Sequence, residues 1–204
     1  MVVSRNDSRT LEQKAERHLW GHFSALGRSL DGTTIIDRGE GCYVWDTHGN
    51  RFLDGLAGLY TTQVGYGRPE LAAAASEQMV KLGYFPIWTY AHPTAVELAA
   101  RLAAMAPGDI NRVYFTSGGS EAVESAFKLA RQYFKETGQG SRTKVVSRNL
   151  AYHGTTMGAL SITGLDFAKT PFEPLVPGAL KVNNTEDFRL AYEGDPELLG
   201  IAAA

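Results

Sequence analysis

The sequence predicts an α/β fold built around a mainly parallel sheet. Three observations support this prediction: strand-like and helix-like segments alternate in the second half of the chain, a glycine-rich loop joins one strand to one helix, and the helical segments are apolar on one face. Alternation favours parallel strands, because each helix returns the chain to the edge where the next strand begins. We therefore expect helices on the faces of the sheet.

The first part of the chain predicts one helix and one β-hairpin. Residues 11–23 carry apolar side chains at helical spacing, so we expect a helix there. The segments 43–46 and 51–54 are rich in aromatic and aliphatic residues, and they flank Thr47-His48-Gly49-Asn50. Short strand-like runs on either side of such a turn are typical of a hairpin.

Two amphipathic helices are expected next, at Pro69–Leu82 and Pro93–Met105. Proline suits the first turn of a helix, where its missing N–H would have no partner in any case. The second helix should end before Pro107-Gly108, because proline and glycine interrupt helices.

The segment from Val113 to Phe134 is the most informative part of the chain. Residues 112–116 predict a strand, Ser117-Gly118-Gly119-Ser120 permits a tight bend, and residues 120–136 predict a helix with an apolar stripe. Free N–H groups and the dipole at that helix start, with the serine hydroxyls, suit a phosphate group. The alternative is an ordinary turn in which Ser120 caps the helix.

A second strand, residues 143–148, is followed by Ala151-Tyr152-His153-Gly154 and then a helix. Ligands bind beyond the carboxyl ends of strands in open parallel sheets, so both loops should meet at one edge. An aromatic ring beside a phosphate site suggests a planar cofactor that is stacked and anchored together. The alternative is a core tyrosine and a structural histidine. Residues 164–190, rich in Pro, Gly and Asn, predict a long surface excursion.

Composition excludes several classes of function. The net charge is −2 and the charged residues are interspersed, which does not favour nucleic acid as a partner. Cys42 is the only cysteine in the sequence and suits a reducing cytoplasm. No apolar run approaches the length of a membrane span.

Motifs for other chemistries are absent or incomplete. Gly65-Tyr66-Gly67-Arg68-Pro69-Glu70 has Glu70 where a dinucleotide-binding loop needs its third glycine, so we interpret it as a turn. A Walker loop and a G-x-S-x-G elbow do not occur. His18 and His22 are four residues apart, but no cluster of ligands accompanies them, and we expect no metal site.

Six motifs occur together in a characteristic order over nearly the whole chain. They are Asp54–Leu59, Val64–Gly67, His92-Pro93, Phe115–Ala122, Ala151–Gly154 and Phe172–Gly178. In this set the chain resembles the N-terminal part of the class III pyridoxal-phosphate-dependent aminotransferases, nearest the ω-amino acid or amine:pyruvate group. The resemblance implies an incomplete PLP-transferase fold of type I. Residues 1–65 would be an N-terminal segment of the small domain, and residues 66–204 the first part of the PLP-binding large domain.

The resemblance also implies roles for individual residues. Gly118, Gly119 and Ser120 would hold the phosphate of pyridoxal 5'-phosphate, Tyr152 would stack on its ring, and His153 would lie beside it. Four further residues would bind substrate, with Tyr60 and Trp88 lining the pocket and Leu19 and Trp20 at its mouth. Core packing is the alternative for these aromatic residues.

Transamination also needs a lysine that attaches the cofactor and a carboxylate at the pyridine nitrogen. In the family both follow the tyrosine–histidine pair at a distance. None of the lysines in this sequence has the family's context: Lys14, Lys81, Lys128, Lys135, Lys144, Lys169 and Lys181. We therefore expect the Schiff-base lysine to lie beyond Ala204. The chain would then be an N-terminal fragment, and these residues alone would have no activity.

The resemblance thus implies a cytoplasmic transaminase, homodimeric with a shared active site, that moves an amino group from an amine or ω-amino acid to a keto acid such as pyruvate. One alternative is a catalytically silent module that binds PLP or phosphate, or that dimerises. Another is a different nucleotide- or phosphate-binding α/β protein that uses the same loop.

Overall fold

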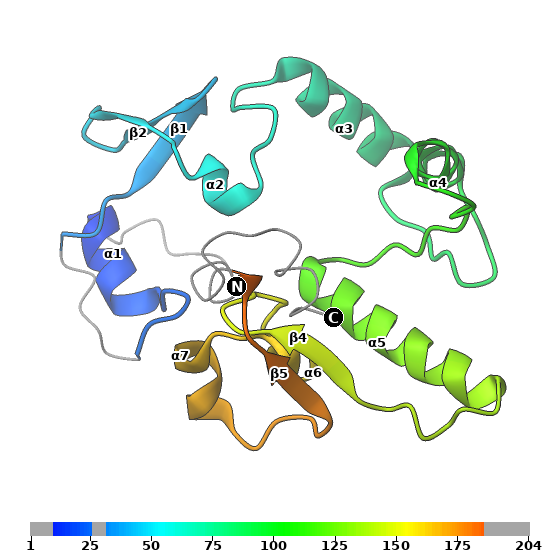
Figure 1. Cartoon of the computed structure of the whole chain (residues 1–204). Coiled ribbons are helices and arrows are strands. Elements are labelled where there is room, and N and C mark those ends of the chain that lie inside the picture. Colours follow the sequence, from blue (N-terminus) through cyan, green and yellow to red (C-terminus); the bar gives the residue numbers. More distant parts are fainter. Residues whose placement is uncertain (1–9, 26–31, 186–204) are drawn as a thin grey trace. The chain divides into compact units, whose positions relative to one another are not determined.

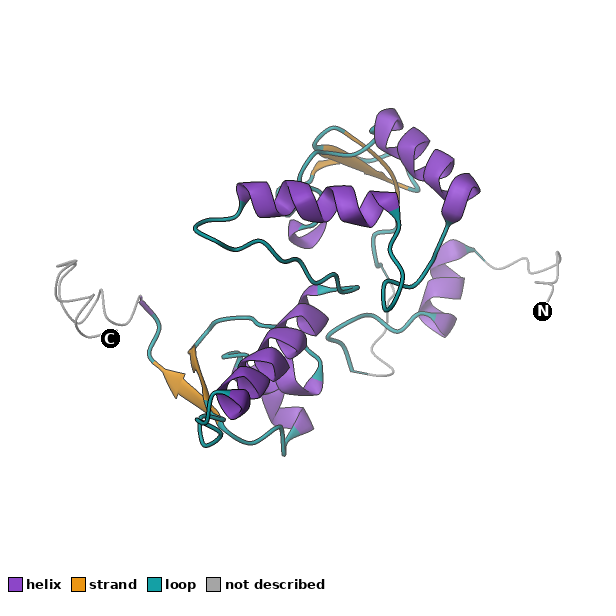
Figure 2. Cartoon of the chain, turned by 90° about the vertical axis from the view of Figure 1, so that its right-hand side faces the viewer, coloured by secondary structure: helices purple, strands orange, loops and turns teal. Residues whose placement is uncertain are grey.

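A computed structural model describes residues 10–25 and 32–185 of the chain (Figure 1). The chain divides into two compact units between Leu98 and Ala99, and each unit is considered by itself below. This division does not test the predicted domain boundary after residue 65, which stays a prediction. Figure 2 shows helices and short strands in both units, as an α/β fold requires.

The first unit begins with α1, Leu11–His18. Thr10 and Gln13 form a capping box: the Thr10 hydroxyl accepts from the Gln13 N–H at 3.3 Å, and the Gln13 side chain accepts from the Thr10 N–H at 2.9 Å. The helix ends five residues earlier than predicted, because the backbone at Leu19 is extended with ψ 123°.

An antiparallel sheet follows, with strands β1 (Ile36–Glu40), β2 (Tyr43–Asp46) and β3 (Arg51–Leu53) in that order. The predicted hairpin is confirmed as β2–β3. Asp46 stabilises its turn, because its carboxylate accepts from the N–H groups of His48 at 2.9 Å and Asn50 at 2.8 Å.

The short helix α2, Ala57–Tyr60, is a left-handed turn. The φ angles of its four residues are +50°, +58°, +61° and +64°. Glycine adopts this conformation freely, whereas the left-handed helix costs roughly 1–2 kcal/mol for each other residue. Ala57, Leu59 and Tyr60 therefore need contacts that hold them there.

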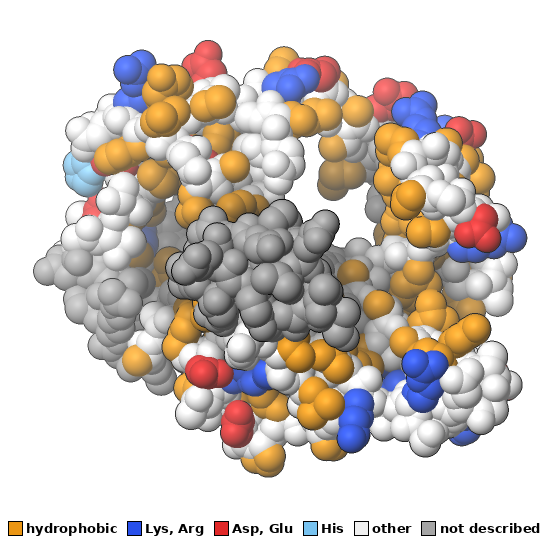
Figure 3. All heavy atoms as spheres, in the orientation of Figure 1, with side chains coloured by type: hydrophobic (Ala, Val, Ile, Leu, Met, Phe, Trp, Pro, Cys, Tyr) orange, Lys and Arg blue, Asp and Glu red, His pale blue; other side chains and the backbone are white. Residues whose placement is uncertain are grey.

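The helices α3 (Pro69–Leu82) and α4 (Pro93–Met105) have the predicted bounds, and α4 runs across the division between the units. Neither helix buries a residue within this chain. Val80 is 88% exposed and Met79 71%. Figure 3 shows hydrophobic side chains on the surface over both helices, which confirms that their apolar faces are not covered here.

The second unit contains α5 (Gly119–Glu136), β4 (Val145–Arg148), α6 (Met157–Ile162), α7 (Asp166–Lys169), a 3-10 turn (Thr170–Phe172) and β5 (Ala179–Val182). β4 and β5 pair in parallel, with Val145 opposite Ala179 and Arg148 opposite Val182. The parallel arrangement is confirmed. The predicted surface excursion over residues 164–190 is wrong in part, since residues 164–185 supply both α7 and the strand β5. Residues 186–190 of this prediction lie outside the described residues.

The predicted strand at residues 112–116 is wrong for this chain, because these residues adopt no regular secondary structure. A strand is stable only when a neighbour satisfies its N–H and C=O groups. Within the described ranges, the strand ladders join β1 to β2, β2 to β3, and β4 to β5. The β-branched and aromatic residues of this segment therefore have no ladder to join.

The core of the second unit lies at α6. Its residues Gly158 to Ile162 are all buried, and Phe127 of α5 is buried with them. α6 contacts α5 as well as β4 and β5. The same helix directly follows the Tyr152-His153 loop, so the best-packed element of the unit supports that loop.

Candidate cofactor site

The glycine loop opens α5 without a side-chain cap. Gly118 is the N-cap residue, with φ −169° and ψ 167°, and the helix begins at Gly119. The alternative in which Ser120 caps the helix is therefore wrong, because Ser120 already lies within its first turn. The first N–H groups of an α-helix have no acceptor within the helix. A Cβ atom added to Gly118 or Gly119 would meet nothing within 4 Å, so the loop leaves space for a ligand.

Two contacts inside the loop engage the Ser117 N–H and the Gly118 carbonyl. The Ser117 N–H donates to the Glu121 carboxylate at 2.9 Å, and the Thr116 hydroxyl donates to the Gly118 carbonyl at 3.1 Å. The Glu121 carboxylate complements the positive end of the helix but would repel a phosphate placed beside it. An anion at this loop is therefore best held from Gly118 to Ser120.

The structure brings the Tyr152-His153 loop against the start of α5. The Thr155 N–H donates to the Ser120 hydroxyl oxygen at 3.1 Å. Gly154 lies so close that an added Cβ would be 2.4 Å from Ser120 Oγ and 2.9 Å from Ser120 Cα. Only glycine fits this approach, and its φ of +122° favours glycine as well. The two loops that the sequence placed at one edge are thus neighbours.

Thr163 supports the same loop through its hydroxyl group. Its side chain is fully buried. The hydroxyl accepts from the His153 N–H at 3.0 Å and donates to the Gly154 carbonyl at 2.9 Å. Tyr152 itself is 57% exposed, so the alternative of a core tyrosine is wrong. Thr163 thus holds the backbone of this loop while Tyr152 stays largely exposed.

Glu124 on α5 is a site residue that the sequence did not reveal. One of its oxygens, Oε1, accepts from the Thr156 hydroxyl at 2.7 Å and from the N–H groups of Gly158 at 2.7 Å and Ala159 at 3.1 Å. The Thr156 hydroxyl, followed by these N–H groups, lowers the pKa of the Glu124 carboxyl below its ordinary value. The positive charge of Lys128, four residues further along the same helix, makes only the smallest of these contributions. The sequence signal that could have indicated this role is the position of Glu124, which lies three residues before Phe127 and therefore beside the apolar stripe of α5.

Lys181 on β5 lies at the other end of α6. Its ammonium donates to the Ser147 hydroxyl at 2.7 Å and to the Ile162 carbonyl, which also accepts from Ser147 at 2.7 Å. Burial, assisted by the nearby Lys169, lowers the pKa of Lys181 to about 8. Its charge still has the sign that suits a helix C-terminus. α6 is thus held by Glu124 at its start and Lys181 at its end.

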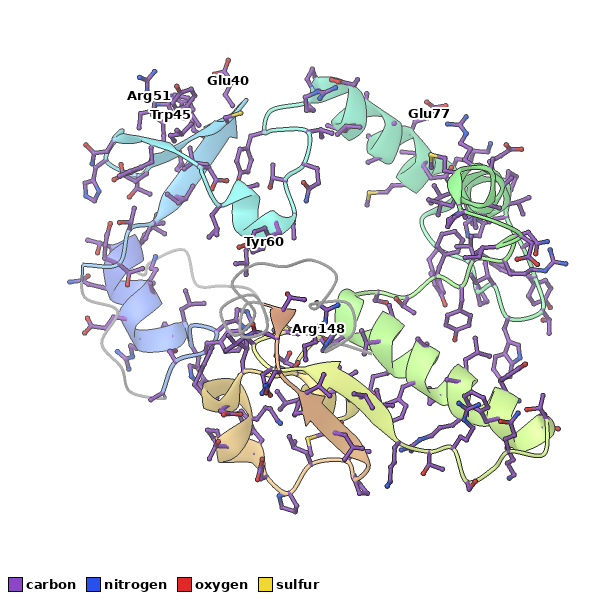
Figure 4. All side chains as sticks on the ribbon, in the orientation of Figure 1. Glu40, Trp45, Arg51, Tyr60, Glu77 and Arg148 are labelled. Carbon is purple, nitrogen blue, oxygen red and sulfur yellow. The ribbon has the colours of Figure 1, made fainter. Side chains whose placement is uncertain are left out.

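The predicted substrate residues all lie in the first unit and are exposed. The exposed fractions are 93% for Trp88, 76% for Tyr60, 63% for Trp20 and 62% for Leu19. Core packing within this chain is therefore the wrong alternative for them. Figure 4 shows the Tyr60 side chain projecting away from the left-handed turn α2. Their place relative to the cofactor loops stays a prediction, because the two units are separate bodies.

No group of three or more His, Cys, Asp or Glu side chains is arranged to hold a metal ion in the described ranges. Across the same residues, every helix is too short or too polar to cross a bilayer.

Comparison with known proteins agrees with this geometry. The class-III aminotransferase family matches residues 28–202. The chain is 53% identical over 197 residues to a probable aminotransferase of Mycobacterium tuberculosis, covering 97% of this chain and 42% of that protein. It is 36% identical over 174 residues to the putrescine–pyruvate aminotransferase of Pseudomonas aeruginosa, covering 85% of this chain and 38% of that protein. The chain thus spans less than half the length of these relatives.

A solved structure supports the same assignment. The ω-transaminase of Pseudomonas jessenii in complex with PMP superposes with a TM-score of 0.88 at 29% identity, covering 96% of this chain and 45% of that one. The family match over residues 28–202 includes the left-handed turn, both cofactor loops and β5. By its sequence and by its fold, this chain belongs to the class-III aminotransferases.

Proposed function

We propose that this chain is the N-terminal part of a PLP-dependent transaminase that moves an amino group from an amine or ω-amino acid to a keto acid such as pyruvate. Membership of the family supports amino transfer. The names of two relatives support the finer statement, because one acts on putrescine and pyruvate and the other was solved with PMP.

The observation that carries the proposal is the contact between Ser120 and the loop after Tyr152. The Ser120 oxygen accepts from Thr155, which leaves its hydroxyl hydrogen to donate to a phosphate oxygen. Together with the N–H groups of Gly118, Gly119 and Ser120, this makes a cradle for one end of PLP. Tyr152 and His153 stand beside that cradle, where an aromatic ring attached to the phosphate would lie.

The chain's residues bind and orient the cofactor in this proposal. Bound PLP supplies an electron-accepting ring next to the carbon that carries the amino group. Tyr152 would cover one face of the ring, while Gly154 and Thr163 keep the backbone of the Tyr152-His153 loop in place. Lys181 donates to Ser147 and Ile162, which argues against Lys181 as the cofactor-linked lysine. In the proposal, which follows the family resemblance here, that lysine and the pyridine-nitrogen carboxylate lie outside these residues.

The assembly and the location are part of the proposal. We expect a homodimer that shares its active site, as in the family, and a cytoplasmic enzyme, since the sequence has a single cysteine. Light scattering of the full-length protein measures the first expectation. A monomer that turns over amine and pyruvate would contradict the shared site.

Cofactor retention tests the assignment of the loop. Ser120→Ala should weaken PLP binding by the full-length protein roughly tenfold or more, because a charge-assisted hydrogen bond is lost. Ser141→Ala, an exposed serine outside the site, is the matched control and should bind like wild type. Equal retention by both variants would contradict the loop assignment.

Turnover separates a transaminase from a silent binding module. The full-length protein, given PLP, putrescine and pyruvate, should form alanine. Bound PLP without transfer from any of a series of amines and ω-amino acids would favour the silent module.

A further inference from the structure

The motif Gly65-Tyr66-Gly67 has a structural role that cofactor binding does not use. The Tyr66 N–H donates to the Gly41 carbonyl at 2.8 Å, and the Gly41 N–H donates to the Tyr66 carbonyl at 3.1 Å. Figure 1 shows the chain after α2 returning toward β1, where this bridge forms. The motif therefore attaches the segment that follows the left-handed turn to the edge of the sheet.

Close packing fixes the ring of Tyr66. A Cβ atom added to Gly39 of β1 would lie 2.5 Å from the ring, so the ring rests directly on the strand backbone. An added Cβ on Gly65 would lie 2.9 Å from the Gly41 carbonyl oxygen. The ring thus rests on Gly39, and Gly65 lets the backbone next to Tyr66 lie against Gly41; no larger residue could replace either glycine without movement.

The hydroxyl of Tyr66 reaches Asp54, twelve residues earlier. It donates to Asp54 Oδ2 at 2.7 Å, and the Gly58 N–H donates to the same oxygen at 2.8 Å. The other oxygen, Oδ1, accepts from the Leu56 N–H at 3.1 Å. The hydrogen bond from Tyr66, ahead of those from the backbone, lowers the pKa of the Asp54 carboxyl. One carboxylate therefore joins the sheet-bound tyrosine to the start of the left-handed turn.

Tyr60 ends that turn, and its direction depends on the turn being left-handed. Were Ala57, Leu59 and Tyr60 to relax to ordinary negative φ angles, the side chain would leave from another side of the backbone. The Tyr60 side chain is 76% exposed, so little else in this chain fixes it.

We propose that Tyr66 and Asp54 are positioning residues that hold the left-handed turn and thereby set where Tyr60 meets the amine donor. The inference rests on the proposed function, in which Tyr60 lines the substrate pocket. Asp54 and Tyr66 contact neither substrate nor cofactor; they act through residues 57–60. Their effect should fall on the choice of donor rather than on cofactor binding.

Donor specificity of the full-length holoenzyme provides the test. Tyr66→Phe removes one hydroxyl and leaves the ring on Gly39, and Asp54→Asn keeps the shape of the side chain. Each should change the ratio of kcat/KM between a small aliphatic and a bulky aryl-alkyl amine by roughly tenfold, mainly through KM. Tyr133→Phe, which removes an exposed hydroxyl on α5, is the matched control and should leave the ratio unchanged.

Hydrogen exchange of the apoprotein gives a second measurement that needs no turnover. The amide protons of Leu56 and Gly58 should exchange faster in Tyr66→Phe than in Tyr133→Phe, because their acceptor is less firmly held. Exchange unchanged from the control would overturn the proposal.

Tyr60→Ala separates the failure of this inference from that of the proposed function. A changed donor ratio in Tyr60→Ala, with Tyr66→Phe and Asp54→Asn matching the control, would overturn the positioning role alone. An unchanged ratio in Tyr60→Ala would overturn both the inference and the substrate role of Tyr60. Cofactor retention by Ser120→Ala would still test the transaminase assignment independently.

Discussion

Glu124 of α5 accepts a hydrogen bond of 2.7 Å from the N–H of Gly158, 34 residues further along the chain. The same oxygen accepts from Thr156 and Ala159. It satisfies N–H groups that the first turn of α6 would otherwise leave unpaired. α6 follows the Tyr152-His153 loop, so this carboxylate connects the helix behind the glycine loop to the helix behind the aromatic loop.

We predict that Glu124→Ala lowers the free energy of unfolding by about 2 kcal/mol, since hydrogen bonds to a charged acceptor are lost and buried donors stay unpaired. Glu124→Gln keeps an acceptor oxygen and should cost less. Denaturant unfolding of both variants measures this, with Glu136→Ala at the exposed end of α5 as the control. A loss in Glu124→Ala no larger than in Glu136→Ala would contradict the bridging role.

Lys181 makes stability depend on pH on the alkaline side. Folding lowers its pKa from 10.5 to about 8, mainly through burial, so its charge is unfavourable in the folded chain. That penalty is fully present below pH 8. It disappears as the pH rises from about 8 to 10.5, where the folded amine is neutral and the unfolded amine still binds a proton.

The Tm of wild type should therefore rise relative to that of Lys181→Met between pH 7 and pH 10. Lys144→Met removes an exposed lysine next to β4 and controls for the loss of one positive charge. Parallel Tm curves for wild type and Lys181→Met over this range would show that the amine does not titrate as described.

Gly154→Ala should separate the two cofactor loops. The added methyl would lie 2.4 Å from Ser120 Oγ and 2.9 Å from Ala159 Cβ, and the backbone has a φ of +122°. Gly138→Ala is the matched control, because Gly138 has a φ of +77° but nothing within 4 Å of an added Cβ.

The control should cost about 1 kcal/mol for its backbone angle alone. Gly154→Ala should cost about 2 kcal/mol more through overpacking, and should bind PLP about tenfold more weakly. Unfolding and PLP titration measure the two effects. If Gly154→Ala bound PLP as Gly138→Ala does, the close approach would not matter for the cofactor.

Thr163→Val tests the support beneath the aromatic loop. Valine has a similar shape but leaves the His153 N–H and the Gly154 carbonyl without the buried hydroxyl, at a cost of about 3 kcal/mol. Thr163→Ser keeps the hydroxyl and should cost about 1 kcal/mol for the missing methyl. Thermal unfolding measures the stability of both variants. An equal loss of stability in Thr163→Val and Thr163→Ser would contradict the hydrogen-bonding explanation.

Local signals in the sequence were sufficient for most helices. The bounds of α3 and α4 match the prediction, and α5 begins one residue earlier than expected. Each has an apolar stripe at helical spacing, and proline opens two of them. The β2–β3 hairpin could also be predicted from the sequence, since its turn residues lie between two short strand-like runs. Such signals involve neighbours within four residues, so no distant partner is needed to interpret them.

Elements that depend on distant partners could not be predicted in this way. Residues 112–116 have the composition of a strand but no ladder in the described structure, whereas the Pro- and Gly-rich region before residue 190 supplies β5. Strand identity is settled by pairing, and pairing is not local. The left-handed turn at residues 57–60 was also hidden, because three of its residues are ones that seldom adopt positive φ.

The sequence by itself determined the family, and it predicts the two cofactor loops and the residues that would touch PLP, because those signals are short motifs in a fixed order. Only the tertiary structure decided how these segments are held: Gly154 against Ser120 and Glu124 and Lys181 at the two ends of α6 support the cofactor loops, and Tyr66 on Asp54 supports the left-handed turn. These contacts join residues from 12 to 35 positions apart. Which side chains meet at such separations depends on how the chain packs, and that information is not contained in any local pattern.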